Sequence, residues 1–156
     1  MKRTDLPSYF GQLVSTTPYV TLATTCLDGK PWNTPVVGFF DEDCILYWAS
    51  WTKSQHSLNI ACEPHIFVVV YDTSLPLGQG AALYLRMHAR MLHDEDEVSA
   101  AMLIYTDRFG EDGSHAAFLG ECPRRLYKAA PLQIWCNTDG ARGGHFVDKR
   151  QLIWQA

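Results

Sequence analysis

The chain has 156 residues, a formal net charge of -4, and 47% hydrophobic against 19% charged residues. This composition excludes a disordered chain and indicates one packed domain over residues 1–156. The mild acidity argues against a nucleic-acid binder, and no apolar run reaches the roughly 20 residues of a membrane helix. Five widely spaced cysteines without a C-x-x-C pair predict reduced, mostly buried thiols in a cytoplasmic protein.

The first third of the chain is predicted to form one helix and three strands. The helix should begin at Thr4-Asp5, with Pro7 in its first turn, and end before Pro18. The strands that follow are apolar and rich in β-branched or aromatic residues. They should cover residues 19–26, 32–40 and 44–51.

Short polar segments separate these three strands. Asp28-Gly29 suits a two-residue hairpin turn that needs positive φ, and Asp41-Glu42-Asp43 forms a second turn. Such tight connections imply antiparallel pairing. Pro35 cannot donate to a ladder, so we expect it at a bulge or at a sheet edge.

The rest of the chain alternates short helices with pairs of strands. Helices are predicted from Ser54 to Cys62 and from Asp94 onward, where Asp94 and Glu97 have the spacing of a capping box. Loops are expected around Pro76–Gly80 and Gly110–Ser114. Four further runs have strand character, at residues 66–71, 83–91, 125–137 and 145–154. Seven strands around one core favour a closed or nearly closed barrel over a parallel sheet.

The second helix begins in a segment rich in hydrogen-bond donors. Lys53, Ser54, Gln55 and His56 surround its start, where free backbone N–H groups and the positive end of the helix dipole favour an anion such as phosphate. The alternative is an ordinary capped helix with solvated polar residues.

Aromatic and branched side chains precede this candidate anion site. Trp48 and Trp51 lie on the preceding strand, and Val36 and Val37 lie on the strand before it. Such residues beside an anion site would suit a planar ring with a phosphate tail, although tryptophans can equally fill a barrel core.

The segment from Tyr19 to Tyr71 resembles the FMN-binding split-barrel proteins related to pyridoxamine 5'-phosphate oxidase. The resemblance rests on Thr34-Pro35-Val36-Val37, on the acidic turn, and on Ser54-x-His56-x-x-Asn59-Ile60-x-x-x-Pro64. The later strands and helix also fall in the family's order. It implies a mainly β (α+β) fold: an antiparallel six- to seven-stranded split β-barrel with flanking short helices.

The resemblance also implies a site for FMN at the interface of a homodimer. The strand around Asn33–Gly38 would line the flavin, and Trp48, Ala49 and Ser50 would lie beside the ring or ribityl chain. The phosphate would be held by Ser54, Gln55 and His56, with Lys53 or Asn59 assisting. Trp135 falls near a late family tryptophan. The implied cofactor-binding set is Asn33, Thr34, Pro35, Val36, Val37, Trp48, Ala49, Ser50, Lys53, Ser54, Gln55, His56, Asn59 and Trp135.

The sequence departs from the family at two places. Gln55 and His56 stand where the family usually has Lys or Arg, which predicts weaker phosphate binding or reliance on Lys53 or an arginine. The end of the chain lacks the oxidase's substrate segment with its Arg and His. The chain therefore resembles small members of the family, not the vitamin B6 oxidase itself.

Three functions fit this sequence. The first is a flavin-dependent oxidoreductase acting on a small molecule, with or without NAD(P)H, in which no side chain need act as acid or base. The second is a non-enzymatic flavin or haem carrier or sensor. The third is a reductase that uses the deazaflavin F420, although its acidic tail would call for a basic groove.

Several polar residues receive no functional assignment. His88 and His145 could act as an acid or base but are expected to be structural or exposed. The alternating face Tyr84, Arg86, His88 and Arg90 is a candidate wall or dimer surface, with a solvated face as the favoured interpretation. No metal site is predicted, because Cys62 and His65 are an isolated pair of potential ligands.

Overall fold

The protein was analysed as a computed structural model, which describes residues 2–74, 76, 82–110, 115–138 and 149–156. The strands are β1 (Tyr19–Thr25), β2 (Pro31–Phe40), β3 (Leu46–Trp51), β4 (His65–Tyr71), β5 (Ala82–Met91), β6 (Arg124–Thr138) and β7 (Lys149–Gln155). The helices are α1 (Ser8–Thr16), α2 (Gln55–Cys62) and α3 (Glu95–Phe109), with 3-10 turns η1 (Arg3–Asp5) and η2 (His115–Phe118).

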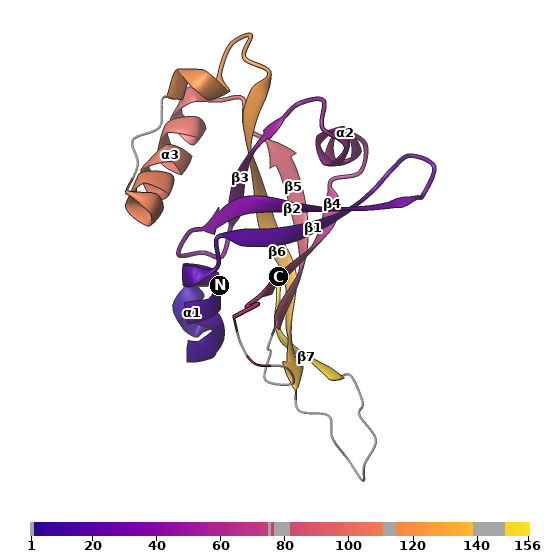
Figure 1. The fold of residues 1–156 in the computed structure, drawn as a ribbon, viewed down its shortest axis with the longest axis vertical. Coiled ribbons are helices and arrows are strands. Elements are labelled where there is room, and N and C mark those ends of the chain that lie inside the picture. The colour runs from indigo at the N-terminus through magenta and orange to yellow at the C-terminus, as the bar shows by residue number, and fades with distance from the viewer. Residues whose placement is uncertain (1, 75, 77–81, 111–114, 139–148) are drawn as a thin grey trace.

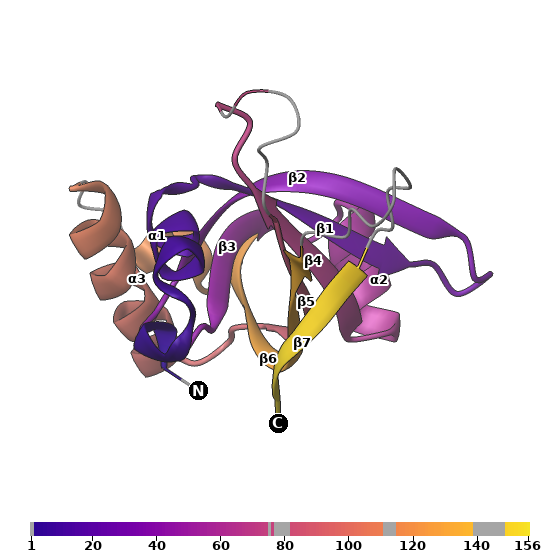
Figure 2. The ribbon, with the colours of Figure 1, turned by 90° about the horizontal axis from the view of Figure 1, so that it is seen from below.

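The strands form an antiparallel barrel in the order β3-β2-β1-β4-β5-β6, and a further pairing of β3 with β6 closes it. The last strand, β7, pairs with β6 outside the closed ring. Figure 2 shows the strands wrapped around a common centre, with α1 and α3 on one side and α2 on the other. The predicted fold class, a six- to seven-stranded split β-barrel, is confirmed.

Two apolar clusters hold this arrangement together. The first fills the barrel and includes Leu22, Trp48, Val68 and Leu85, none more than 1% exposed. The second lies outside the barrel wall, where α3 packs on β2, β3 and β6 (Figure 1). Its residues are Phe39, Tyr47, Leu92, Val98, Ala101, Met102 and Leu126. Successive residues of β3 point to opposite sides of the wall, so this one strand serves both clusters.

Three boundaries differ from the sequence prediction for local reasons. The first helix begins after Pro7 because a separate 3-10 turn occupies Arg3–Asp5. Cys26 N–H donates to Lys30 O, so the first hairpin loop has one residue more than predicted, with Gly29 at positive φ as expected. The third strand starts at Leu46 because Cys44 adopts a φ of 59°.

The later strand and loop predictions fall partly within the described residues. The strand Arg124–Thr138 matches the predicted 125–137 run. The first residues of the predicted 145–154 strand, with His145, lie outside the described residues, as does most of the two predicted loops. All five cysteines are free thiols, but two of them are buried, so the expectation of mostly buried cysteines was wrong.

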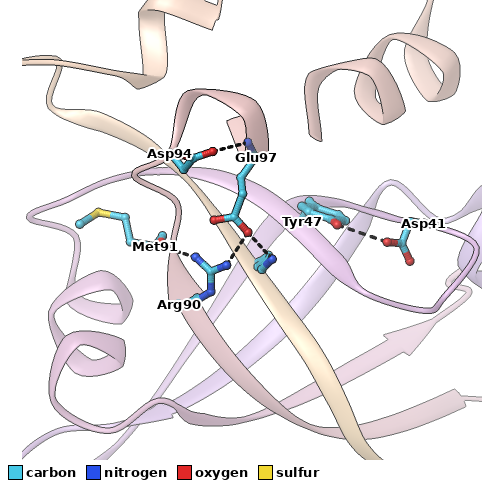
Figure 3. Close-up of polar contacts among 7 residues, drawn as sticks. Asp41, Tyr47, Arg90, Met91, Asp94 and Glu97 are labelled. Atoms are coloured by element: carbon cyan, nitrogen blue, oxygen red, sulfur yellow. Dashed lines mark hydrogen bonds and ion pairs between the residues drawn. The ribbon is translucent and has the colours of Figure 1, made fainter. Parts of the chain in front are cut away.

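The third helix is tied to the barrel by a charged network around Glu97 (Figure 3). Asp94 caps the helix by accepting from the Glu97 N–H at 3.1 Å, which is half of the predicted capping box. The Glu97 carboxylate does not complete the box. It accepts hydrogen bonds from Arg90 of β5 and Lys128 of β6, each at 2.5 Å. One carboxylate therefore joins three elements.

This network predicts a pH-dependent contribution to stability. The hydrogen bonds from Arg90 and Lys128 lower the pKa of Glu97 from 4.5 to about 2. Because the folded-state pKa is depressed, the stabilisation is complete above pH 4.5 and is lost as the pH falls towards 2. We expect Glu97→Gln to lower the free energy of unfolding by about 1–2 kcal/mol at pH 7, allowing for solvent screening.

Urea unfolding of the wild type and Glu97→Gln at pH 7 and pH 3 measures this contribution. The difference between the two proteins should shrink at pH 3. Glu95→Gln, two residues earlier in the first turn of the same helix, is the control and should change stability less. A constant difference across this pH range would show that Glu97 acts through packing and not through its charge.

Candidate functional site

The barrel wall opens between β2 and β3. These strands pair from Phe40/Leu46 to Gly38/Trp48, and within the described residues the ladder ends there. Beyond that point β2 pairs with β1 alone, and β3 pairs with β6. Pro35 lies on the diverging part of β2, at the sheet edge where its missing N–H is tolerated, as predicted.

Gly38 marks the point where the two strands diverge. A Cβ atom at this position would lie 2.8 Å from Leu46 Cδ1 and 3.1 Å from Val20 Cγ2, inside the barrel. Such distances are shorter than normal van der Waals contact, so a side chain would push β2 away from β3 or displace core residues. The glycine thus allows the close approach from which the opening starts.

A cavity of about 650 Å³ occupies this opening on the outer side of the wall. Its floor comes from β2 and β3, and α3, η2 and the start of β6 add a second wall. The lining residues are Thr34, Pro35, Val36, Val37, Phe39, Ala49, Ser50, Trp51, His56, Met102, Tyr105, Ala117, Phe118, Arg124 and Leu126. The volume is within the range of about 300–1,000 Å³ typical of small-molecule sites.

Half of the residues expected from the sequence meet at this cavity. They come from the diverging segments of β2 and β3 and from the first turn of α2. They are Thr34, Pro35, Val36, Val37, Ala49, Ser50 and His56. Trp51, noted in the sequence for its flat ring, also lines the cavity and is largely exposed.

The polar end of the cavity is a cluster of hydroxyl groups around His56. The imidazole is 6% exposed, and its Nε2 lies 2.7 Å from Ser50 Oγ. Ser54 Oγ lies 3.1 Å from Ser50 Oγ and 3.2 Å from the same Nε2, and donates to Ser57 Oγ at 2.9 Å. Burial lowers the pKa of His56, so the ring is neutral at pH 7.

Ser54 precedes the first residue of α2 but does not cap it with its side chain. Its hydroxyl is directed to Ser50, His56 and Ser57, so it accepts no bond from the first-turn N–H groups. A hydrogen-bond acceptor placed beside this end of the cavity would meet those backbone donors together with the serine hydroxyls.

The other polar residues expected to bind a ligand near the helix start include two that stabilise the fold instead. Gln55 Nε2 donates to Asn59 Oδ1 at 2.8 Å, and Asn59 Nδ2 donates to Thr24 Oγ1 of β1 at 2.9 Å. This chain of bonds fixes α2 against the barrel. Lys53 and Asn33 are exposed, each adjacent in sequence to residues around the cavity but not part of its lining.

The two tryptophans assigned by resemblance lie away from the cavity. Trp48 is fully buried inside the barrel and stacks on Tyr127 with ring centroids 5.4 Å apart. Trp135 lies on the outer face of β6, beside Phe67 at 6.0 Å and under the Arg86 guanidinium at 5.7 Å. Neither side chain contributes to the lining of this cavity.

Sequence reasoning missed the wall formed by α3, η2 and β6. Met102 and Tyr105 lie on the helix predicted from Asp94 onward, but a predicted helix alone does not reveal a cavity. No motif or spacing in the sequence places Phe118, Arg124 and Leu126 near β2. The register pairs Trp51 with Arg124, so β3–β6 closure brings these residues to the site.

The charge of the described cavity lining is positive. Arg124 is its one permanently charged side chain, and its guanidinium lies 5.6 Å from the Phe118 ring centroid. The remaining lining is apolar apart from hydroxyls and the neutral His56. The described lining of the cavity therefore combines apolar surface, a polar end at His56 and one cation, Arg124.

The described residues contain neither a cluster of three metal ligands nor a helix that could span a membrane. No group of three or more His, Cys, Asp or Glu side chains has a geometry that could hold a metal ion there. None of the helices in the described ranges is long and apolar enough to cross a membrane.

No protein-family model matches the sequence, and neither does any curated protein. Solved structures do match. HutZ, the haem storage protein of Vibrio cholerae, is 17% identical, with 90% of this chain and 99% of that chain covered and a TM-score of 0.70. An F420 reductase is 23% identical over 83% and 98% of the two chains, with a TM-score of 0.61.

A third structure is a candidate pyridoxamine 5'-phosphate oxidase from Listeria innocua. It is 15% identical, with 79% of this chain and 90% of that chain covered and a TM-score of 0.60. At these identities the likeness concerns the backbone arrangement. The chain therefore has the split-barrel fold of the pyridoxamine 5'-phosphate oxidase-like proteins.

Proposed function

We propose that the protein binds FMN in the cavity between β2 and β3 and acts as an oxidoreductase on a small molecule. The observation that carries this proposal is the shape and chemistry of one cavity, an apolar slot of about 650 Å³ that ends in the Ser50–Ser54–His56 cluster. A planar ring with a phosphorylated tail needs both parts. The fold shared with an F420 reductase is consistent with it.

The chain's own residues would have separate roles toward FMN. Val36, Ala49 and Leu126 offer apolar surface to a flat ring, and the diverging edge of β2 offers backbone groups. Bound FMN supplies hydride transfer. The protein contributes orientation, exclusion of water and hydrogen bonds to the ring.

The phosphate would lie at the first turn of α2. Neutral His56 brings no charge there, so recognition depends on the Ser50 and Ser54 hydroxyls, on backbone N–H groups, and on Arg124 and Lys53. This set is less cationic than the family pattern, and it predicts moderate affinity for FMN.

Absorbance measurement of the purified protein tests the proposal directly. We expect a yellow protein, or a colourless one that takes up added FMN at one molecule per chain. Anaerobic mixing with NADH or NADPH should then bleach the flavin, whereas a passive carrier would stay yellow. A colourless protein that fails to bind added FMN would exclude the proposed function.

Arg124→Gln tests the phosphate contacts. Charge-assisted hydrogen bonds contribute about 1.5–3 kcal/mol, so the Kd for FMN should rise about tenfold or more. Riboflavin has no phosphate, and its Kd should change little. Lys30→Gln, in the β1–β2 hairpin and paired with Asp28, is the control. Equal losses of FMN and riboflavin would place the phosphate elsewhere.

Haem is the second candidate ligand, because HutZ is described as a haem storage protein and shares this fold. A Soret band on addition of hemin, with no uptake of FMN, would favour it. The cavity argues for flavin, since the one histidine of its described lining is buried and hydrogen-bonded to Ser50 through Nε2 and is therefore not free to bind iron.

F420 is a third candidate ligand. Its acidic tail would have Arg124 as the one cation of the described lining to bind to.

We also propose a homodimer formed by the outer face of the sheet. This face carries the half-buried rings of Phe67, Tyr84 and Trp135, and its other end carries Tyr19 and Val37, both exposed. Val37 also lines the cavity, so a second copy on this face would add a wall to the site. Sedimentation analysis should give twice the chain mass, and a monomer carrying bound FMN would refute the shared site.

A further inference from the structure

Two histidines lie directly opposite each other on neighbouring strands. His65 is the first residue of β4, and the register pairs it with His88 of β5. Both side chains point to the outer face of the sheet, and both are exposed. Their ring centroids are 5.4 Å apart, with the ring planes at 85°. Two imidazoles thus share one small area of surface, and neither belongs to the described lining of the cavity.

Glu63 holds the ring of His65 in a defined orientation. Its Oε1 accepts the backbone N–H of His65 at 2.9 Å and lies 2.6 Å from His65 Nδ1. A carboxylate accepts only, so the proton of the neutral ring is on Nδ1 and the lone pair is on Nε2. Histidines that bind metals commonly donate their second nitrogen to a carboxylate in this way.

We propose that His65 and His88, with Glu63 as a positioning residue, form a two-histidine site for a divalent transition metal ion such as Zn²⁺ or Ni²⁺. With metal–nitrogen bonds of about 2.1 Å at a tetrahedral angle, the two ring centroids would be about 5 Å apart. The observed 5.4 Å requires little backbone movement. The Glu63 contact keeps Nε2 of His65 available to the ion, and the exposed ring of His88 can turn about χ2 until one of its nitrogens faces the same ion.

This site has fewer protein ligands than a structural zinc site. No third His, Cys, Asp or Glu in the described residues completes it, so water fills the other positions. Affinity should accordingly be moderate. Imidazole suits Zn²⁺, Ni²⁺ and Cu²⁺, and does not suit Mg²⁺ or Ca²⁺.

Two neighbouring residues offer competing explanations. Cys62, the last residue of α2, is an exposed thiol three positions before His65. His93 lines the same surface hollow as His88. A metal bound by Cys62 with His65, or by His88 with His93, would not need the cross-strand pair. Variants at both positions separate these cases.

Isothermal titration with NiCl2 and ZnCl2 at pH 7.5 in the presence of a phosphine reductant tests the proposal. We expect one saturable ion per chain, and no comparable binding of MgCl2. His65→Ala and His88→Ala should each abolish saturable binding. Glu63→Ala should weaken it about 10- to 100-fold, whereas Glu63→Gln, which keeps an acceptor, should retain most of the affinity.

Three variants serve as controls. His115→Ala removes an exposed histidine of η2, and it should bind Ni²⁺ as the wild type does, as should Cys62→Ser and His93→Ala. Thermal unfolding without metal shows that each variant is folded. The proposal is overturned if the wild type shows no saturable binding, if His65→Ala or His88→Ala binds normally, or if Cys62→Ser or His93→Ala loses the ion.

Discussion

Trp48→Ala should lower the free energy of unfolding by about 3–5 kcal/mol, among the largest effects of any single substitution in this chain. The indole is fully buried in the barrel and stacked on Tyr127, and alanine would leave a cavity that the closed β3–β6 and β2–β3 pairings prevent from collapsing. Urea unfolding followed by circular dichroism measures the change.

Trp48→Phe tests the two parts of the side chain separately, because it keeps an aromatic ring in the core and removes the indole N–H. Within the described structure the Nε1 of Trp48 is buried and has no hydrogen-bond partner, so its removal sacrifices no bond. Trp48→Phe should therefore lower the free energy of unfolding by clearly less than Trp48→Ala does. Trp51→Ala, at an exposed position of the same strand, should lower it little. A Trp48→Phe loss as large as that of Trp48→Ala would reveal a polar partner for the indole.

Ala49→Phe should raise the Kd for FMN about 100-fold or more, which corresponds to about 3 kcal/mol. Ala49 lies on β3 between Trp48 and Ser50, and its methyl group lines the cavity beside Leu126. A phenyl ring would occupy the space that a flat ligand needs. Because part of the ring can project into this space, the loss in stability should stay within about 1–3 kcal/mol. Fluorescence quenching of free FMN measures the affinity.

Ala100→Phe adds the same ring to an exposed position of α3 and is the matched control. It should leave both FMN affinity and stability near the wild-type values. Riboflavin binding to Ala49→Phe should fall as much as FMN binding, because the slot serves the ring and not the phosphate. Unchanged FMN binding by Ala49→Phe would place the ligand outside this cavity.

The sequence was sufficient to predict most of the barrel, because its strands have local signatures. The alternation of Leu83, Leu85 and Met87 with polar residues and the β-branched run 66–71 each specify a strand without reference to the rest of the chain. Boundaries were less predictable. The third strand starts late because Cys44 takes a left-handed conformation, which its residue type does not indicate.

The floor of the cavity was also predictable, and its wall was not. Residues of β2, β3 and α2 are close together in sequence, so a resemblance over one segment reaches Val36, Ala49 and His56 together. The contribution of Met102 and Phe118 depends on how α3 and η2 dock on the barrel. Gln55 and Asn59 were predicted to bind the phosphate, but their side chains hydrogen-bond within the protein. Donors beside a helix start can stabilise the fold instead of binding a ligand, and the sequence does not distinguish the two cases.

The pairing of β3 with β6 has a consequence for the order of folding. Leu46 pairs with Ala129, more than eighty residues later, whereas β1, β2 and β3 are joined by short loops. The entropy of closing so long a loop must be overcome before its contacts form, and this non-local pairing should be a slow step. Until β6 arrives, the opening between β2 and β3 lacks its Arg124 and Leu126 wall. Ligand binding should therefore report on complete closure of the barrel and not on the early meander.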